Sequence, residues 1–134
     1  MRQTKHEPAT AAEHAVTVLT VDDEPAFRAA ARAVVHATPG FRPVAEAASG
    51  AEAIALAERL RPDLVLMDVR MPGLDGVEAA HAIARVSPRS AVVFVSADGA
   101  HAVPLAARPK TALAVLAKEE LRPARLRRLW SWRA

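Results

Sequence analysis

The chain has 134 residues, of which 51% are hydrophobic and only 4% aromatic, and its formal net charge is +3. This length suits one domain with an aliphatic core, and the absence of cysteine excludes disulfides and thiolate metal sites. No apolar run approaches the roughly 20 residues needed to cross a bilayer, and the N-terminus lacks the apolar segment of a secretory signal. We therefore expect a soluble, cytoplasmic protein without a membrane partner.

Strands and helices are predicted to alternate along the chain. We expect residues 1–15 to form a flexible tail and residues 16–134 to form the single domain. Short apolar runs, rich in β-branched residues, predict five buried strands. These strands cover residues 16–21, 42–48, 64–67, 91–95 and 112–116. The regions between and after them predict helices that begin near Pro25, Ser49, Asp75, His101 and Pro123.

Local signals support most of these helices. Pro25 suits a first helical turn. Ser49 with Glu52, and Asp75 with Glu78, have the spacing of an N-terminal capping pair. The region 98–111 is different, because its prolines should leave only a short or irregular helix over residues 101–107.

The alternation of strands and helices predicts an α/β fold, with a five-stranded parallel sheet covered by helices on both faces. In such open sheets, ligands bind at the carboxyl ends of the strands. The polar residues that follow the predicted strands are Asp22, Asp23 and Glu24, then Asp68, Ser96 and Lys118. Because apolar strands precede them, we expect these side chains to form a functional site rather than part of the core.

Three carboxylates at one edge of the sheet would repel each other strongly unless a cation lay between them. Oxygen ligands without histidine or cysteine favour a hard ion, above all Mg²⁺. Asp68 follows the middle strand of the set, so we expect it to be the nucleophile that accepts a phosphoryl group. Lys118 and the Ser96 hydroxyl would stabilise the transferred group.

Four motifs in this sequence resemble the signature set of response-regulator receiver domains. They are Val-Asp-Asp-Glu at 21–24, Leu-Met-Asp-Val-Arg-Met-Pro-Gly-Leu-Asp-Gly at 66–76, Val-Ser-Ala at 95–97 and Leu-Ala-Lys at 116–118. The resemblance spans roughly residues 16–130 and implies a doubly wound, flavodoxin-like fold. The pattern is most similar to regulators that carry a helix-turn-helix output domain, which this chain does not include. It is therefore expected to be either a stand-alone receiver or a fragment of a longer DNA-binding regulator.

The resemblance also implies a role for each site residue. Asp68 is the phospho-acceptor, Ser96 bonds the phosphoryl group and Lys118 pairs with it. Asp23, Asp68 and the backbone carbonyl of Arg70 are implied as direct Mg²⁺ ligands, and Asp22 as a ligand through water. Self-phosphorylation and slow autodephosphorylation are the only enzymatic steps expected.

The implied partners are a sensor histidine kinase or a histidine phosphotransfer protein, together with a downstream protein. The last two predicted helices and the strand between them would form the partner face, where a weak homodimer is also expected. Arginines crowd the C-terminal helix, and we interpret them as a solvated helix face rather than a nucleic-acid site.

One departure from the family pattern keeps an alternative open. Receivers usually have an aromatic residue three positions before the lysine, but here that residue is Val115, whose side chain is short and stiff. A degenerate receiver, which binds partners without being phosphorylated, is therefore one alternative. A Mg²⁺-dependent phosphohydrolase is another, although such enzymes usually place an acid two residues after the nucleophile, where this chain has Arg70.

Overall fold

The computed structural model describes residues 15–133 and is built on a five-stranded parallel sheet. The strands lie in the order β2-β1-β3-β4-β5. Their bounds are β1 Val16–Val21, β2 Phe41–Ala47, β3 Leu64–Asp68, β4 Ala91–Ser96 and β5 Ala112–Ala117. Each predicted strand is confirmed to within one residue. The tail predicted over residues 1–15 lies, apart from residue 15, outside the described part of the chain and stays a prediction.

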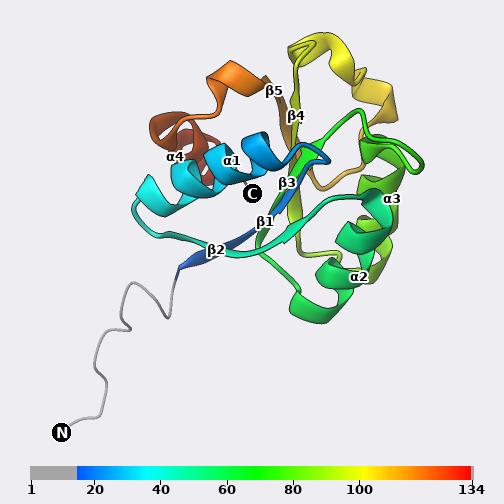
Figure 1. Ribbon diagram of the computed structural model, residues 1–134, viewed down its shortest axis with the longest axis horizontal. Helices are drawn as coiled ribbons and strands as arrows, with labels where there is room; N and C mark the ends of the chain where they lie inside the picture. The colour runs from blue at the N-terminus through cyan, green and yellow to red at the C-terminus, as the bar shows by residue number, and fades with distance from the viewer. Residues whose placement is uncertain (1–14, 134) are drawn as a thin grey trace, which may run out of the picture.

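Four α-helices cover the two faces of the sheet. They are α1 (Pro25–Ala37), α2 (Gly50–Leu60), α3 (Gly76–Val86) and α4 (Pro123–Ser131). Helices α1 and α4 lie on one face, and α2 and α3 on the other (Figure 1). Among residues 15–133, no helix is both long enough and apolar enough to span a bilayer.

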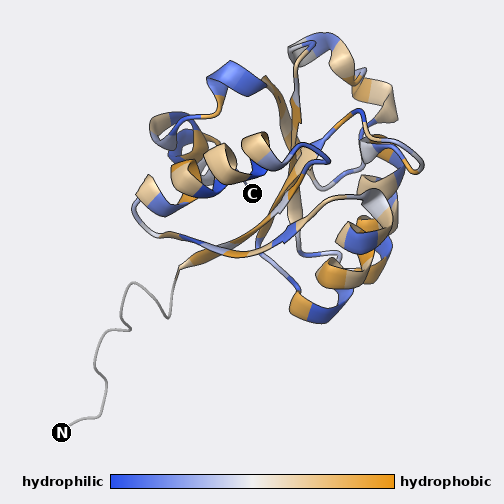
Figure 2. Ribbon diagram, in the orientation of Figure 1, coloured by the Kyte–Doolittle hydropathy of each residue, from blue (hydrophilic) through white to orange (hydrophobic). Residues whose placement is uncertain are grey.

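The core forms two layers because strand side chains alternate between the faces of the sheet. On β3, Leu64 and Leu66 pack with α1 and α4, whereas Val65 and Met67 pack with α2 and α3. All five residues of β3 are buried, as expected for a central strand with helices on both sides. In Figure 2, orange and blue segments alternate along the helices, as expected for helices with one apolar side and one polar side.

The caps of α2 and α3 were predicted with unequal success. At α3, Asp75 accepts the Glu78 N–H and Glu78 accepts the Asp75 N–H, which completes the predicted capping box. At α2, the Ser49 hydroxyl accepts the Glu52 N–H as expected. The Glu52 carboxylate, however, accepts the N–H of Ala48, one residue before the cap.

The short or irregular helix predicted over residues 101–107 is not an α-helix. That region contains two 3₁₀ turns, Ala100–Ala102 (η1) and Leu105–Ala107 (η2). Pro104 separates them, because it has no N–H to donate to a continuing helix. Side-chain contacts to backbone hold the region instead: Arg108 Nε donates to the Val103 carbonyl at 3.1 Å, and His81 Nε2 of α3 donates to the Ala107 carbonyl at 2.8 Å.

Candidate functional site

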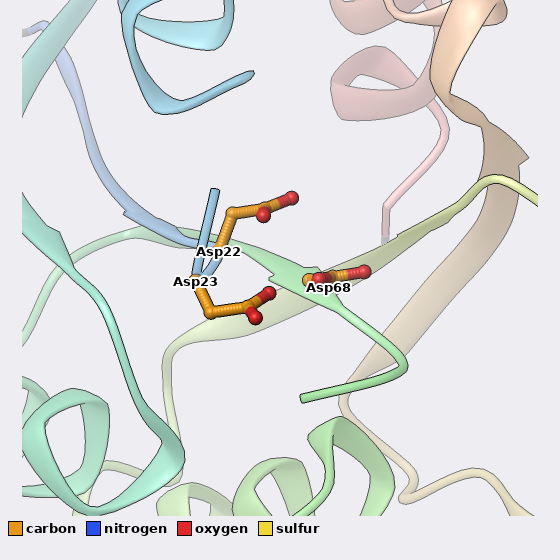
Figure 3. Close-up of side chains that lie close together, drawn as sticks. All are labelled: Asp22, Asp23 and Asp68. Carbon is orange, nitrogen blue, oxygen red and sulfur yellow. The ribbon is translucent and has the colours of Figure 1, made fainter. Parts of the chain in front are cut away.

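The strand order places three aspartates at the carboxyl edge of the sheet. Asp22 and Asp23 directly follow β1, and Asp68 is the last residue of the adjacent strand β3. One carboxylate oxygen from each of the three lies within 4.8 Å of the others. Figure 3 shows the side chains of Asp22 and Asp23 extending from the end of β1 towards the side where Asp68 lies. The predicted acidic cluster is therefore formed.

The neighbouring strands β4 and β5 complete a pocket around this cluster. Its volume is about 310 Å³. The pocket is lined by every residue that the sequence analysis proposed for the site: Asp22, Asp23, Asp68, Arg70, Ser96 and Lys118. Glu24, Ala97 and Asp98 complete the lining. Residues far apart in the sequence thus meet at one end of the sheet, as the parallel topology requires.

Lys118 leans towards the start of α1. Its Nζ lies 3.0 Å from Oδ2 of Asp22 and 3.7 Å from Oε1 of Glu24. It also lies 4.5 Å from the centre of the Phe27 ring, which adds a cation–π contact. Partial burial lowers the pKa of Lys118, but the carboxylates of Asp22, Asp68 and Glu24 outweigh that effect and raise it. Lys118 is therefore a fixed positive charge beside the aspartates.

The carboxyl group of Asp68 has a raised pKa. Burial, and then the negative charge of Asp22, raise its pKa from 3.8 to about 6. Asp23 acts in the same direction, while Lys118 and the backbone N–H of Arg70 partly oppose the rise. Asp68 is only 7% exposed, so its charge is costly without further positive charge nearby.

Asp22 supplies a buried carboxylate to the site. Its Oδ1 accepts the N–H of Glu24 at 2.8 Å, which fixes the carboxylate. Its Oδ2 is fully buried and lies 3.0 Å from the Lys118 ammonium, with which it forms an ion pair. Together with Asp23 and Asp68, Asp22 places more negative charge in the pocket than the single Lys118 ammonium balances, which suits a further cation. The donor set contains only oxygen, which fits Mg²⁺.

Ser96 and Arg70 differ in burial: Ser96 is buried within the pocket, whereas the Arg70 side chain is exposed at its rim. Ser96 is buried, and its Oγ accepts the N–H of Asp98 at 3.0 Å. The Arg70 side chain lies at the surface, where its Nε pairs with Asp98 at 2.8 Å. The Arg70 side chain is thus paired with Asp98 rather than with Asp22, Asp23 or Asp68. A role for its carbonyl as a ligand stays a prediction.

Four residues that contact or support the site were not assigned a role from sequence. They are Glu24 and Phe27 beside Lys118, Asp98 beside Arg70, and Gly76 behind Asp68. Glu24 and Gly76 lie inside the motifs at 21–24 and 66–76, so these motifs could have pointed to a role for both residues. Phe27 and Asp98 act through contacts between elements, for which the sequence offered no spacing to read.

Comparison with known protein families gives an independent result. A family model described as the response regulator receiver domain matches residues 18–129. The chain is 42% identical over 83 residues to the positive alginate biosynthesis regulatory protein of Pseudomonas aeruginosa, covering 61% of this chain and 34% of that protein. It is 40% identical over 87 residues to a protein-glutamate methylesterase/protein-glutamine glutaminase of Alkalilimnicola ehrlichii, covering 63% and 22%. The match thus spans about a third or less of these relatives.

Solved structures agree with the fold. The receiver domain of a putative response regulator NarL from Mycobacterium tuberculosis superposes with a TM-score of 0.74 at 31% identity, covering 90% of this chain and 99% of that one. The response regulator domain of Thermotoga maritima CheB gives 0.76 at 25% identity, covering 87% and 95%. A chain of the CheX-CheY-BeF3-Mg²⁺ complex from Borrelia burgdorferi gives 0.71 at 26% identity, covering 85% of each chain.

Proposed function

The chain belongs to the response-regulator receiver family, and we propose that it accepts a phosphoryl group on Asp68 with the help of Mg²⁺. One observation carries this proposal. The Asp68 carboxylate shares a pocket with two further aspartates, the Ser96 hydroxyl and the Lys118 ammonium. That set contains a nucleophile, metal ligands, a hydrogen-bond donor and a positive charge, which together suit phosphoryl transfer.

Asp23, Asp68 and the Arg70 backbone carbonyl would hold Mg²⁺ directly, and Asp22 would hold it through water. The ion supplies positive charge that lets the carboxylates lie close together and that offsets charge on the phosphoryl oxygens. Ionised Asp68 is required for attack. Lys118 favours the ionised form, whereas Asp22 and Asp23 disfavour it, and the positive charge of the ion would offset their effect. The chain similar to this one from B. burgdorferi was crystallised in a complex that contains Mg²⁺, which supports the choice of metal.

In the proposed reaction, an Oδ atom of Asp68 attacks the phosphorus of a phosphohistidine on a sensor kinase or phosphotransfer protein. The P–N bond breaks, its electrons stay on the imidazole nitrogen, and that nitrogen takes a proton from solvent. Lys118 would pair with one phosphoryl oxygen. The Ser96 Oγ already accepts a backbone N–H, so its own proton would be donated to another phosphoryl oxygen.

The two alternatives are less well supported by the arrangement of the site. A degenerate receiver is expected to have lost part of the acidic cluster or the lysine, yet all of these residues line one pocket. A phosphohydrolase needs an acid–base group two residues after the nucleophile. Arg70 occupies that position and pairs with Asp98 at the surface.

Signalling would then depend on protein contacts. Between β4 and β5 the chain forms the η1 and η2 turns instead of an α-helix, so the proposed contact surface is reduced to those turns, β5 and α4. We retain a downstream protein, or a weak homodimer through α4, as the proposed partner of that surface. Light scattering with and without the phosphoryl group would reveal such a dimer.

The direct test is incubation of the full chain with acetyl phosphate and Mg²⁺, followed by intact mass spectrometry. The proposal predicts one added phosphoryl group, which is absent after chelation with EDTA and absent in Asp68→Asn. Asp98→Asn is the matched control, because Asp98 is an exposed aspartate of the same pocket, and it should keep the adduct. An adduct that persists in Asp68→Asn, or no adduct in the wild-type chain, would reject the proposal.

A further inference from the structure

A second pocket lies at the opposite edge of the sheet from Asp68. It is a hollow of about 270 Å³ between the start of β4, the start of β5 and the end of α4. Its charged lining consists of Arg89, Lys110 and Arg133, and no acidic residue among residues 15–133 lines it. Its apolar lining includes Pro88, Leu113 and Trp130. Three positive charges therefore surround one concave, partly apolar surface.

None of these three cations forms an ion pair with a carboxylate among residues 15–133. Asp63 is an acidic residue next to the hollow. Its backbone carbonyl accepts the N–H of the lining residue Ala91 at 3.0 Å. Its carboxylate is engaged elsewhere, because it accepts the backbone N–H and the hydroxyl of Thr17 at 2.9 and 3.1 Å. The positive charge of the hollow is thus not neutralised by the described part of the fold.

One of the cations is already held in position. The Arg133 guanidinium lies 3.8 Å from the centre of the Trp130 ring, and its NH1 donates to the Trp130 carbonyl at 2.9 Å. Trp130 itself packs edge-on against Phe41, with ring centres 6.2 Å apart. Fixing an arginine by stacking and a hydrogen bond reduces the conformational entropy that it would lose on binding a ligand. The remaining N–H groups of the guanidinium stay available as donors.

We propose that this hollow binds a small phosphate-bearing anion, as a site distinct from the Asp68 pocket. Two guanidinium groups offer pairs of donors that match phosphate oxygens, and a lysine adds a point charge. A concave surface lined by one sign of charge and by apolar side chains concentrates such anions. The ligand is either free inorganic phosphate or an organic phosphomonoester whose carbon skeleton contacts Pro88, Leu113 and Trp130.

Isothermal titration calorimetry of the full chain tests the proposal, in buffer with EDTA so that no Mg²⁺ draws phosphate to Asp68. Inorganic phosphate and phenyl phosphate are the probes, and a hexaglutamate peptide is the comparison. We expect inorganic phosphate and phenyl phosphate each to bind at one saturable site. Tighter binding of phenyl phosphate identifies an organic phosphomonoester as the ligand, and equal binding identifies free phosphate.

Variants then locate the site. Arg89→Gln and Lys110→Gln should each weaken binding by about fivefold, the effect expected for one exposed charge-assisted contact. Arg127→Gln is the matched control, because Arg127 is an exposed arginine of α4 that does not line the hollow, and it should leave binding unchanged. The proposal is overturned by the absence of saturable binding of either probe, by an equal loss in Arg127→Gln, or by binding of hexaglutamate alone. Unchanged thermal unfolding of each variant shows that it is folded.

Discussion

The α-carbon of Gly76, at the start of α3, lies directly against the main-chain carbonyl of Asp68. A β-carbon at position 76 would clash with that carbonyl oxygen and would lie 2.9 Å from the carbonyl carbon. The Gly76 N–H donates to the next carbonyl, that of Val69, at 2.9 Å. The helix start therefore packs on the backbone that holds the proposed phospho-acceptor, and only glycine leaves room for this contact.

Gly76→Ala should consequently damage both the fold and the site. The β-carbon has to displace backbone rather than a flexible side chain, and we expect a loss of about 2 kcal/mol in the free energy of unfolding. A shift of Asp68 by about 1 Å would also slow its phosphorylation by about a hundredfold. Thermal unfolding and the rate of adduct formation from acetyl phosphate measure the two effects.

Gly73→Asn is the control for that experiment. Gly73 lies in the same loop with a φ of +78°, and no atom lies within 4 Å of the place that a β-carbon would take there. Asparagine tolerates positive φ better than most residues, so this variant should stay within about 1 kcal/mol of the wild-type stability. Equal damage from both substitutions would show that the loop, rather than the contact with Asp68, is sensitive.

Lys118→Met should separate metal binding from phosphorylation. The substitution removes the ammonium that lies 3.0 Å from Asp22. The net charge of the site becomes more negative, so the aspartates should bind Mg²⁺ about tenfold more tightly. Phosphorylation should nevertheless fall, because the charge proposed to pair with the phosphoryl group is lost. Calorimetric titration with Mg²⁺ and intact mass measure the two effects, and Lys110→Met, at the other edge of the sheet, is the control. Weaker Mg²⁺ binding in Lys118→Met would contradict this account of the lysine.

The raised pKa of Asp68 predicts how stability changes with pH when Mg²⁺ is absent. The pKa is about 6 in the folded chain and near 3.8 when unfolded, so the folded state binds more protons between these values. The free energy of unfolding contributed by Asp68 should therefore fall as the pH rises from about 4 to about 6, and level off above. Urea unfolding in EDTA measures it, as the difference between Asp68→Asn and the wild-type chain. A difference that does not change with pH would show that Asp68 titrates normally.

Val115 is buried in the core layer that faces α2 and α3, at the position where receivers usually carry an aromatic residue. A phenylalanine there would have to fit among Ala102, Val103 and Ala107, which belong to the same cluster. Val115→Phe should therefore lower the free energy of unfolding by about 1–3 kcal/mol through overpacking. Urea unfolding tests this. Unchanged stability would show that the core can accommodate the ring.

The sheet and the acidic cluster could be predicted because several signals agreed. Four of the five strands, such as Leu64–Asp68, are short apolar runs that end at a polar residue or just before one. Parallel topology then fixes that these ends meet, so Asp22, Asp68 and Lys118 could be placed together without knowing any distance.

Other features of the structure could not be predicted, because they depend on backbone geometry or on contacts between elements. Between Ser96 and Ala112 the prolines predict only a short or irregular helix, and the two 3₁₀ turns found there agree with that prediction. The positive φ of Gly99, directly before the first turn, could not be predicted. The position of Lys118 beside Phe27 joins the end of β5 to the start of α1, and no spacing along the sequence encodes such a contact. The cation-lined hollow likewise combines residues from three separate segments.

The central claim is that folding makes Asp68, among all carboxylates of the chain, the one that takes the phosphoryl group. Reduction of the acetyl phosphate-treated chain with borohydride converts an aspartyl phosphate to homoserine, and peptide mapping then locates it. We predict homoserine at position 68, formed only when Mg²⁺ is present during phosphorylation. Homoserine at position 22, 23 or 98, or its absence from the phosphorylated chain, would contradict the account.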